Sequence, residues 1–246
     1  MNQIPKVIHY IWFGHGQKPE LLQKCIESWK KYLPGWEIHE WNESNFDISA
    51  CNYAMEAYEA KKYAFASDYA RFVVLYQNGG VYLDTDVEML KPFPENLLSL
   101  EGFSGMESNN KIAPGLIFAV QPRNPIVKKI IDVYEGIHFH DTSSLKTIVD
   151  YTTELFEQYG FHQENSVQDV AGFRIFPAEY FCGYDLDIKE YAITPNTISV
   201  HHYAHTWGNP KSKRAKKIKM AIKRIVGVKN YRKLLMIKRK LFGVSK

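Results

Sequence analysis

The stretch FASDYARFVVLYQNGGVYLDTDVEML, residues 65–90, decides the expected fold of this 246-residue chain. Its first half has the composition of a packed helix, and Asn78-Gly79 is a typical helix end. The apolar run VYLD (81–84) follows at once and predicts a buried strand. The preceding residues predict the same alternation, with strands over 6–14 and 36–41 and helices over 18–35 and 53–62. This alternation predicts an α/β sheet with short connections.

The remainder of the chain is less regular. Its expected elements are a strand over 115–122, helices over 125–136 and 143–159, a mixed segment over 174–184 and a late strand over 197–208. We expect one domain over 1–208. The last part, 209–246, is expected to form a tail of two short, basic amphipathic helices.

Charge divides the chain into two unlike parts. Residues 211–246 hold 15 Lys and Arg and no acid, which leaves 16 basic against 27 acidic residues in 1–210, a net charge of −11 there. The tail has three interpretations: a helical pair packed on the body, a segment that binds anionic lipid, or a nucleic-acid binding segment. We favour contact with an anionic membrane surface and expect no nucleic-acid partner, because no aromatic platform accompanies the charge.

Cysteine usage and hydropathy indicate the expected location. The three cysteines are widely spaced and include no CxxC motif, which argues against a disulfide framework or a structural zinc site. The N-terminal sequence lacks the pattern of a signal peptide, and no apolar run approaches the roughly 18 residues of a membrane span. We therefore expect a cytoplasmic protein, peripheral at the inner face of the cell membrane through its tail.

Two carboxylates, Asp84 and Asp86, close the strand at 81–84. Ligands of open α/β sheets bind beyond the carboxyl ends of strands, and side chains at alternate positions of an extended chain point to the same side. Two such acids are hard oxygen ligands suited to Mg²⁺ or Mn²⁺, and a bound ion would hold a diphosphate. Because DxD also occurs by chance, as in Asp185-Leu186-Asp187, the motif needs support from its surroundings.

The helix before this strand carries Asp68 and Arg71, which share a face. One interpretation is a surface ion pair, worth at most about 1 kcal/mol. The other is a pair that hydrogen-bonds sugar hydroxyls. Near the end of the expected domain, the segment HHYAHTWG (201–208) adds three histidines and a tryptophan, and an imidazole would complete a metal shell around the two acids. The alternative for this segment is a histidine-rich surface turn.

Three stretches together resemble glycosyltransferase family 32: IPKVIHYIWFG at the N-terminus, residues 65–90, and HHYAHTW near residue 200. This family includes bacterial surface-polysaccharide transferases and the yeast initiating mannosyltransferase, and is related to the catalytic domain of the clostridial glucosylating toxins. The resemblance implies a GT-A fold for 1–208, a UDP- or GDP-sugar donor, a divalent cation (Mn²⁺ or Mg²⁺) and retention of anomeric configuration. The acceptor is expected to be a glycan or a lipid-linked saccharide in capsule or surface polysaccharide synthesis.

The resemblance also implies roles for single residues. Trp12 matches the aromatic residue that stacks on the donor base, with a core tryptophan as the alternative. Asp68 and Arg71 match the residues that bind the donor sugar. Asp84 matches the acid near ribose and sugar, and Asp86 matches the direct metal ligand. These four charged residues form the expected catalytic set.

In the C-terminal motif, His202 matches the metal ligand and Trp207 a residue that contacts the donor phosphates. His205 is a second candidate ligand, and His201 is expected to point into the core. The chain departs from the family at 114–115, where Pro-Gly replaces the usual Asn-Gly, so that the contact made by that asparagine has no counterpart in register.

Other functions remain open on the sequence. VYLDTDVEM also resembles the first motif of haloacid-dehalogenase-type phosphatases, in which Asp84 would be the nucleophile and Asp86 the general acid. That motif usually opens its domain, whereas here it follows 80 residues of α/β pattern. A binding protein that recruits partners through the basic tail is the third alternative.

Overall fold

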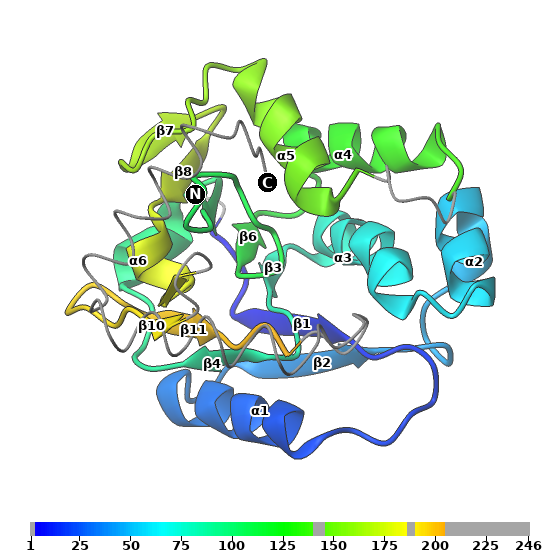
Figure 1. The fold of residues 1–246 in the computed structure, drawn as a ribbon, viewed down its shortest axis with the longest axis horizontal. Helices are drawn as coiled ribbons and strands as arrows, with labels where there is room; N and C mark the ends of the chain where they lie inside the picture. Colours follow the sequence, from blue (N-terminus) through cyan, green and yellow to red (C-terminus); the bar gives the residue numbers. More distant parts are fainter. Residues whose placement is uncertain (1–2, 140–145, 186–189, 205–246) are drawn as a thin grey trace, which may run out of the picture.

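The structure, a computed structural model, describes residues 3–139, 146–185 and 190–204. A seven-stranded sheet in the order β2-β1-β3-β6-β5-β8-β7 forms its centre (Figure 1). The strands of this sheet are β1 (Val7–Ile11), β2 (Glu37–Trp41), β3 (Gly80–Tyr82), β5 (Gly102–Gly105), β6 (Phe118–Val120), β7 (Gln168–Val170) and β8 (Phe173–Phe176). The pairs β1–β2, β1–β3 and β5–β8 are parallel, whereas β6 runs antiparallel to β3 and β5, and β7 antiparallel to β8.

Helices cover both faces of the sheet, and two short ribbons flank it (Figure 1). The helices are α1 (Glu20–Tyr32), α2 (Asn52–Glu59), α3 (Tyr63–Asn78), α4 (Pro125–Glu135), α5 (Ile148–Glu157) and α6 (Ala178–Phe181), with 3₁₀ turns η1 (Ile48–Ala50) and η2 (Glu95–Ser99). The ribbons are β4 (Val87–Met89) with β11 (Ser199–His201), and β9 (Tyr184–Asp185) with β10 (Glu190–Tyr191). Among the described helices, none combines the length and the apolar character that crossing a membrane requires.

The strands alternate their side chains between two buried faces. Ile8 and Val81 pack in one hydrophobic cluster with Trp29 of α1, whereas Tyr82 and Phe118 pack in another with α3 and α4. Because both faces are covered, the central strands are almost continuously apolar. The expected α/β fold is confirmed.

Local signals set the helix ends. The N–H of Gly79, at φ +64°, bonds to the carbonyl of Leu75 and ends α3 at the predicted Asn78-Gly79 pair. Asn124 caps α4 through its side chain. A capping box of Thr147 and Asp150 begins α5, which fixes the start of the helix expected over 143–159.

Strand β7 and two further features of the sheet were not predicted. Strand β5 is the short sequence Gly-Phe-Ser-Gly, which lacks a strand composition. Its glycine at 102 is required by packing, since a Cβ there would lie 2.3 Å from the ring of Phe173. The antiparallel insertion of β6 between β3 and β5 is also a tertiary outcome. The expected tail, 209–246, lies outside the described residues.

His9 is a fully buried histidine in the middle of β1. Its Nδ1 accepts a hydrogen bond from the indole of Trp41 at 3.1 Å, and its Nε2 donates to the carbonyl of Gly79 at 3.0 Å. Only the neutral ring can make both hydrogen bonds, because one nitrogen must accept and the other must donate. Burial lowers the pKa of His9 to about 4. His9 in its neutral form therefore connects the end of α3 to the sheet through its hydrogen bond to Gly79.

We expect stability to fall when this histidine must be protonated. Because the unfolded chain binds the proton more readily, the free energy of unfolding should decrease between about pH 6.5 and 4, by up to about 3 kcal/mol. Urea titrations of wild type and His9→Gln across this pH range isolate the contribution of His9 to the free energy of unfolding, because all other titratable groups are present in both proteins. Parallel pH dependences of the two proteins would contradict the prediction.

Candidate active site

Asp84 and Asp86 lie on a turn at the end of β3. The strand ends at Tyr82, and the N–H of Val87 bonds to the carbonyl of Asp84 at 3.0 Å. The extended geometry expected for the pair is therefore wrong, because the chain turns here to enter β4. The turn nevertheless keeps both carboxylates in one cluster.

His201 joins these two carboxylates. Its Nε2 lies 2.8 Å from Asp86 Oδ1 and 3.9 Å from Asp84 Oδ2, and one ligand atom from each residue lies within 4.8 Å of the others. The antiparallel pairing of β11 with β4, which places His201 opposite Val87, brings the imidazole to this point. Two carboxylates and one imidazole form a donor set that suits a divalent transition-metal ion such as Mn²⁺.

His202 lies elsewhere, which corrects the assignment expected from the sequence. Its Nε2 contacts Glu88 at 2.8 Å, and its Nδ1 contacts the hydroxyl of Tyr191 at 2.6 Å. Neighbouring residues of an extended segment point to opposite sides, and the register with β4 selects His201 for the acidic cluster. His205 and Trp207, the other residues expected from this segment, lie outside the described part of the chain.

The Asp68–Arg71 pair is buried and connects to the same cluster. Arg71 Nη2 lies 2.7 Å from Asp68 Oδ1, and Arg71 Nη1 lies 3.3 Å from Asp84 Oδ1. Only 4% of the Arg71 side chain and 11% of the Asp68 side chain are exposed, so a surface ion pair is excluded. The guanidinium also lies over the ring of Tyr82 at 4.6 Å, and the Tyr82 hydroxyl donates to Asp84 at 3.0 Å.

Burial and charge act in opposite directions on the ionisable groups. Burial raises the pKa of Asp68 to about 7, although the guanidinium of Arg71 opposes this shift. Burial acts in the same direction on Asp86, but the charge of His201 and hydrogen bonds, including one from the Ala204 amide, outweigh it and lower its pKa to about 2. Asp86 is therefore an anion at neutral pH, as a cation ligand must be.

Gly115 forms one wall of the cluster. Its carbonyl accepts from the N–H of Asp84 at 3.0 Å, and a Cβ at this position would lie 2.1 Å from Asp84 Oδ2. The glycine of the Pro114-Gly115 pair is thus required for the position of the carboxylate. Asn109 and Asn110 bond within their own loop and to Gln163, and none of these contacts involves the acidic cluster.

Replacement of Gly115 by alanine should lower activity sharply with little loss of stability. The added methyl group occupies the place of Asp84 Oδ2, and the carboxylate must rotate away from Arg71. Gly136→Ala is the matched control, because a Cβ there meets its nearest atom at an ordinary 3.5 Å. Metal-dependent nucleotide release and thermal melting would be measured together, and an active Gly115→Ala protein would contradict this role.

Trp12 directly follows β1 at the same edge of the sheet. Its backbone N–H bonds to the Trp41 carbonyl at 2.8 Å, and its indole N–H donates to the carbonyl of Gly16 at 2.9 Å. Because β1 and β3 are parallel neighbours, Trp12 and Asp84 both follow the carboxyl ends of their strands. The half-buried indole is compatible with either of its two expected roles.

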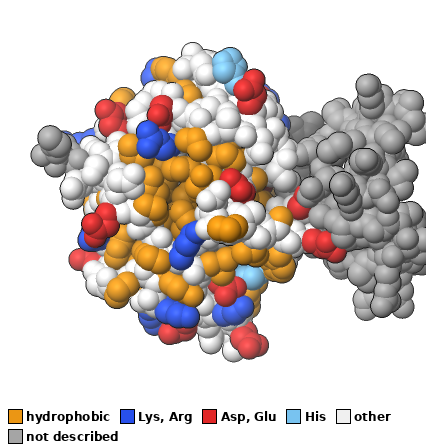
Figure 2. Space-filling model, turned by 90° about the vertical axis from the view of Figure 1, so that its left-hand side faces the viewer, with side chains coloured by type: hydrophobic (Ala, Val, Ile, Leu, Met, Phe, Trp, Pro, Cys, Tyr) orange, Lys and Arg blue, Asp and Glu red, His pale blue; other side chains and the backbone are white. Residues whose placement is uncertain are grey.

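A shallow groove lies apart from this cluster. Hydrophobic side chains gather on the face that carries α6 and β7 (Figure 2). The groove there has a volume of about 350 Å³ and is lined by Pro94, Asn96, Leu97, Val167, Asp169, Arg174, Phe176, Tyr180 and Ile198. None of the residues in the acidic cluster lines it, so the groove does not define the candidate site.

Comparison with known proteins agrees with this geometry. The profile of the glycosyltransferase sugar-binding region containing the DXD motif matches residues 19–104. Inositol phosphoceramide mannosyltransferase 1 of Schizosaccharomyces pombe is 27% identical over 65% of this chain and 52% of its own length. The Subversion of eukaryotic traffic protein A of Legionella pneumophila is 25% identical over 54% of this chain and 25% of its own length.

A solved structure shares the fold. The PaToxG glycosyltransferase superposes with a TM-score of 0.50 and 21% identity over 64% of this chain and 69% of that one. The chain spans about half the length of the mannosyltransferase and about a quarter of the length of the Legionella protein. The profile match over 19–104 and the mannosyltransferase relative support the expected class, a DXD glycosyltransferase of the family 32 type, and the PaToxG structure supports the fold.

Proposed function

We propose that the protein is a metal-dependent, retaining glycosyltransferase that moves a sugar from a UDP- or GDP-sugar to a glycan or lipid-linked acceptor. The observation that carries the proposal is the convergence of Asp84, Asp86 and His201 beside the buried Asp68–Arg71 pair. The family match supports the enzyme class, whereas donor, acceptor and a role in capsule synthesis are proposals.

The acidic cluster would hold the cation and the donor diphosphate. Asp84, Asp86 and His201 would be its ligands, and the ion would stabilise the charge that develops on the leaving nucleotide. Arg71 would fix Asp84 on one side, as the 3.3 Å contact between them supports. Asp68 would present its remaining oxygen to sugar hydroxyls. Trp12 would stack on the base, and Trp207 would contact the phosphates.

Retention of the anomeric configuration would follow from attack of the acceptor hydroxyl on the same face of the sugar that the nucleotide leaves. A double displacement requires a free carboxylate next to the anomeric carbon. Asp68 is a poor candidate because Arg71 holds its Oδ1 at 2.7 Å. The departing phosphate oxygen would instead take the proton of the acceptor.

A phosphatase that uses Asp84 as its nucleophile is disfavoured by the surroundings of this residue. Its Oδ1 accepts a hydrogen bond from Tyr82 and lies 3.3 Å from Arg71. Both contacts lower the nucleophilicity of a carboxylate. They suit an acid that binds a ligand.

Nucleotide release tests the proposal. The purified protein would be incubated with Mn²⁺ and a panel of UDP- and GDP-sugars without acceptor, and free UDP or GDP would be measured. Slow, metal-dependent release from one donor is expected and would identify the sugar. Release from none, together with hydrolysis of a phosphate monoester, would favour the phosphatase.

We also propose a cytoplasmic location with contact to the membrane through 211–246. The proposal rests on the 15 basic residues of this segment, each worth on the order of 1 kcal/mol near an anionic surface. Sedimentation with anionic and neutral vesicles, with and without residues 211–246, tests it. Equal sedimentation with both vesicle types would reject it.

A further inference from the structure

Residues 201–204 wrap around Asp86. His201 contacts its Oδ1, and the amide of Ala204 donates to its Oδ2 at 2.8 Å. Between them, the amide of His202 donates to the Asp86 carbonyl at 3.0 Å. Side chain and backbone of the central acid are therefore held by one short segment.

Tyr203 makes this wrapping possible through an unusual backbone. Its φ is +48°, in the left-handed region that a bulky side chain rarely adopts. The reversal at this residue returns the chain so that the amide of Ala204 points at Asp86. Backbone strain of this kind persists only where surrounding contacts fix it, and it clusters at functional sites.

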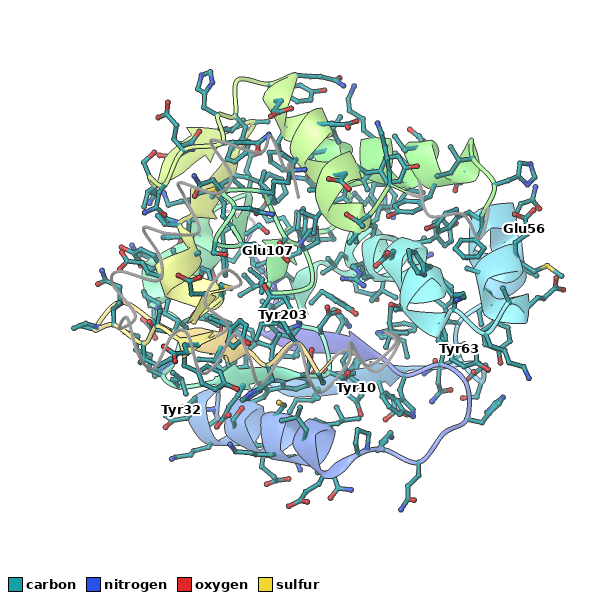
Figure 3. The ribbon with its side chains drawn as sticks, in the orientation of Figure 1. Tyr10, Tyr32, Glu56, Tyr63, Glu107 and Tyr203 are labelled. Atoms are coloured by element: carbon teal, nitrogen blue, oxygen red, sulfur yellow. The ribbon has the colours of Figure 1, made fainter. Side chains whose placement is uncertain are left out.

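The ring of Tyr203 supplies such contacts. Its centroid lies 4.1 Å from that of His201, with the two planes at 66°, and 5.4 Å from the ring of Tyr184. The hydroxyl lies 3.3 Å from Cys182 Sγ and 3.4 Å from Glu107 Oε1. Figure 3 shows the labelled Tyr203 and Glu107 near the middle of the molecule.

We propose that Tyr203 is a positioning residue of the metal site. Its ring sets the plane of the His201 imidazole, and its left-handed backbone aims the Ala204 amide at Asp86. The inference rests on the proposed function, since it assumes that Asp86 and His201 bind the cation. It adds a residue outside the proposed ligand set that determines how well the ligands are arranged.

A Mn²⁺ binding titration of the full chain tests this role without requiring activity. Binding is measured from the electron paramagnetic resonance signal of the free ion. Tyr203→Gly keeps the left-handed turn accessible but removes the ring, so that its Kd for Mn²⁺ should rise by about tenfold or more, as for residues that orient metal ligands. Tyr203→Phe retains the ring and should bind close to wild type. Lys61→Gly, at another left-handed residue in the α2–α3 connection with φ +58°, is the matched control and should not change the Kd.

The outcomes separate this inference from the proposed function. Wild-type affinity in Tyr203→Gly, with binding lost in Asp86→Asn, would overturn the role of Tyr203 alone. Absence of Mn²⁺ binding in the wild type, or binding unaffected by Asp86→Asn, would overturn the metal site and with it the inference. Thermal melting of each variant shows that a changed Kd belongs to a folded protein.

Discussion

Replacement of Asp86 by asparagine is expected to lower metal-dependent nucleotide release by at least about a hundredfold, the usual cost of losing a group that stabilises developing charge. Asp86 is the anion at the centre of the cluster, and His201 together with the Ala204 amide keeps its pKa near 2. The amide group preserves the volume and removes the charge. Release would be measured with the preferred donor at saturating Mn²⁺.

The control for this experiment is Asp169→Asn on β7. Asp169 is an exposed acid paired with Arg174, and it lies in the groove away from the cluster. The same chemical change there should leave release unaltered. Activity near wild type in Asp86→Asn would remove Asp86 from the site.

Replacement of Arg71 by methionine is expected to lower the free energy of unfolding by about 3–5 kcal/mol, because it leaves a buried carboxylate without its partner. Arg71 contacts both Asp68 and Asp84, and its methylene groups would be replaced by a side chain of similar length. Nucleotide release should also be lost, since the position of Asp84 depends on the guanidinium. Urea unfolding and the release assay would be measured on the same preparation.

Two further variants separate stability from function. Arg71→Met combined with Asp68→Asn should recover part of the stability, because the unpaired charge is gone, but none of the activity. Arg174→Met removes an arginine from an exposed pair and should cost at most about 1 kcal/mol. Equal losses in Arg71→Met and Arg174→Met would contradict the burial argument.

Local sequence determined much of the fold. The Asn78-Gly79 signal, the apolar run after it and the alternation upstream were sufficient for an α/β sheet, because helix ends and strand periodicity depend on neighbouring residues. Local sequence did not reveal β5, whose glycine at 102 is explained only by the ring of Phe173 across the sheet. It also did not reveal the antiparallel direction of β6.

The candidate site divides in the same way. The types and spacing of residues in 65–90 and 201–208 were sufficient to predict that the acids, the arginine and a histidine belong to one candidate site. The choice of His201 over His202 depends on the register of β11 against β4, which no local pattern encodes. The contact of Tyr82 with Asp84 had a signal in their alternate spacing, whereas those of Gly115 and the Ala204 amide had none.

The sequence by itself therefore determined the class of fold, the resemblance to a family and the kinds of groups in the candidate site, because these follow from composition and short-range spacing. Only the tertiary structure decided that Asp68 and Arg71 are buried beside Asp84, that His201 meets Asp86, and that Tyr203 turns back on it. The reason is physical. The burial of Asp68 and Arg71 depends on the helices and strands packed around them, and the contacts on Asp86 join segments more than a hundred residues apart, so that their energies belong to the packed molecule.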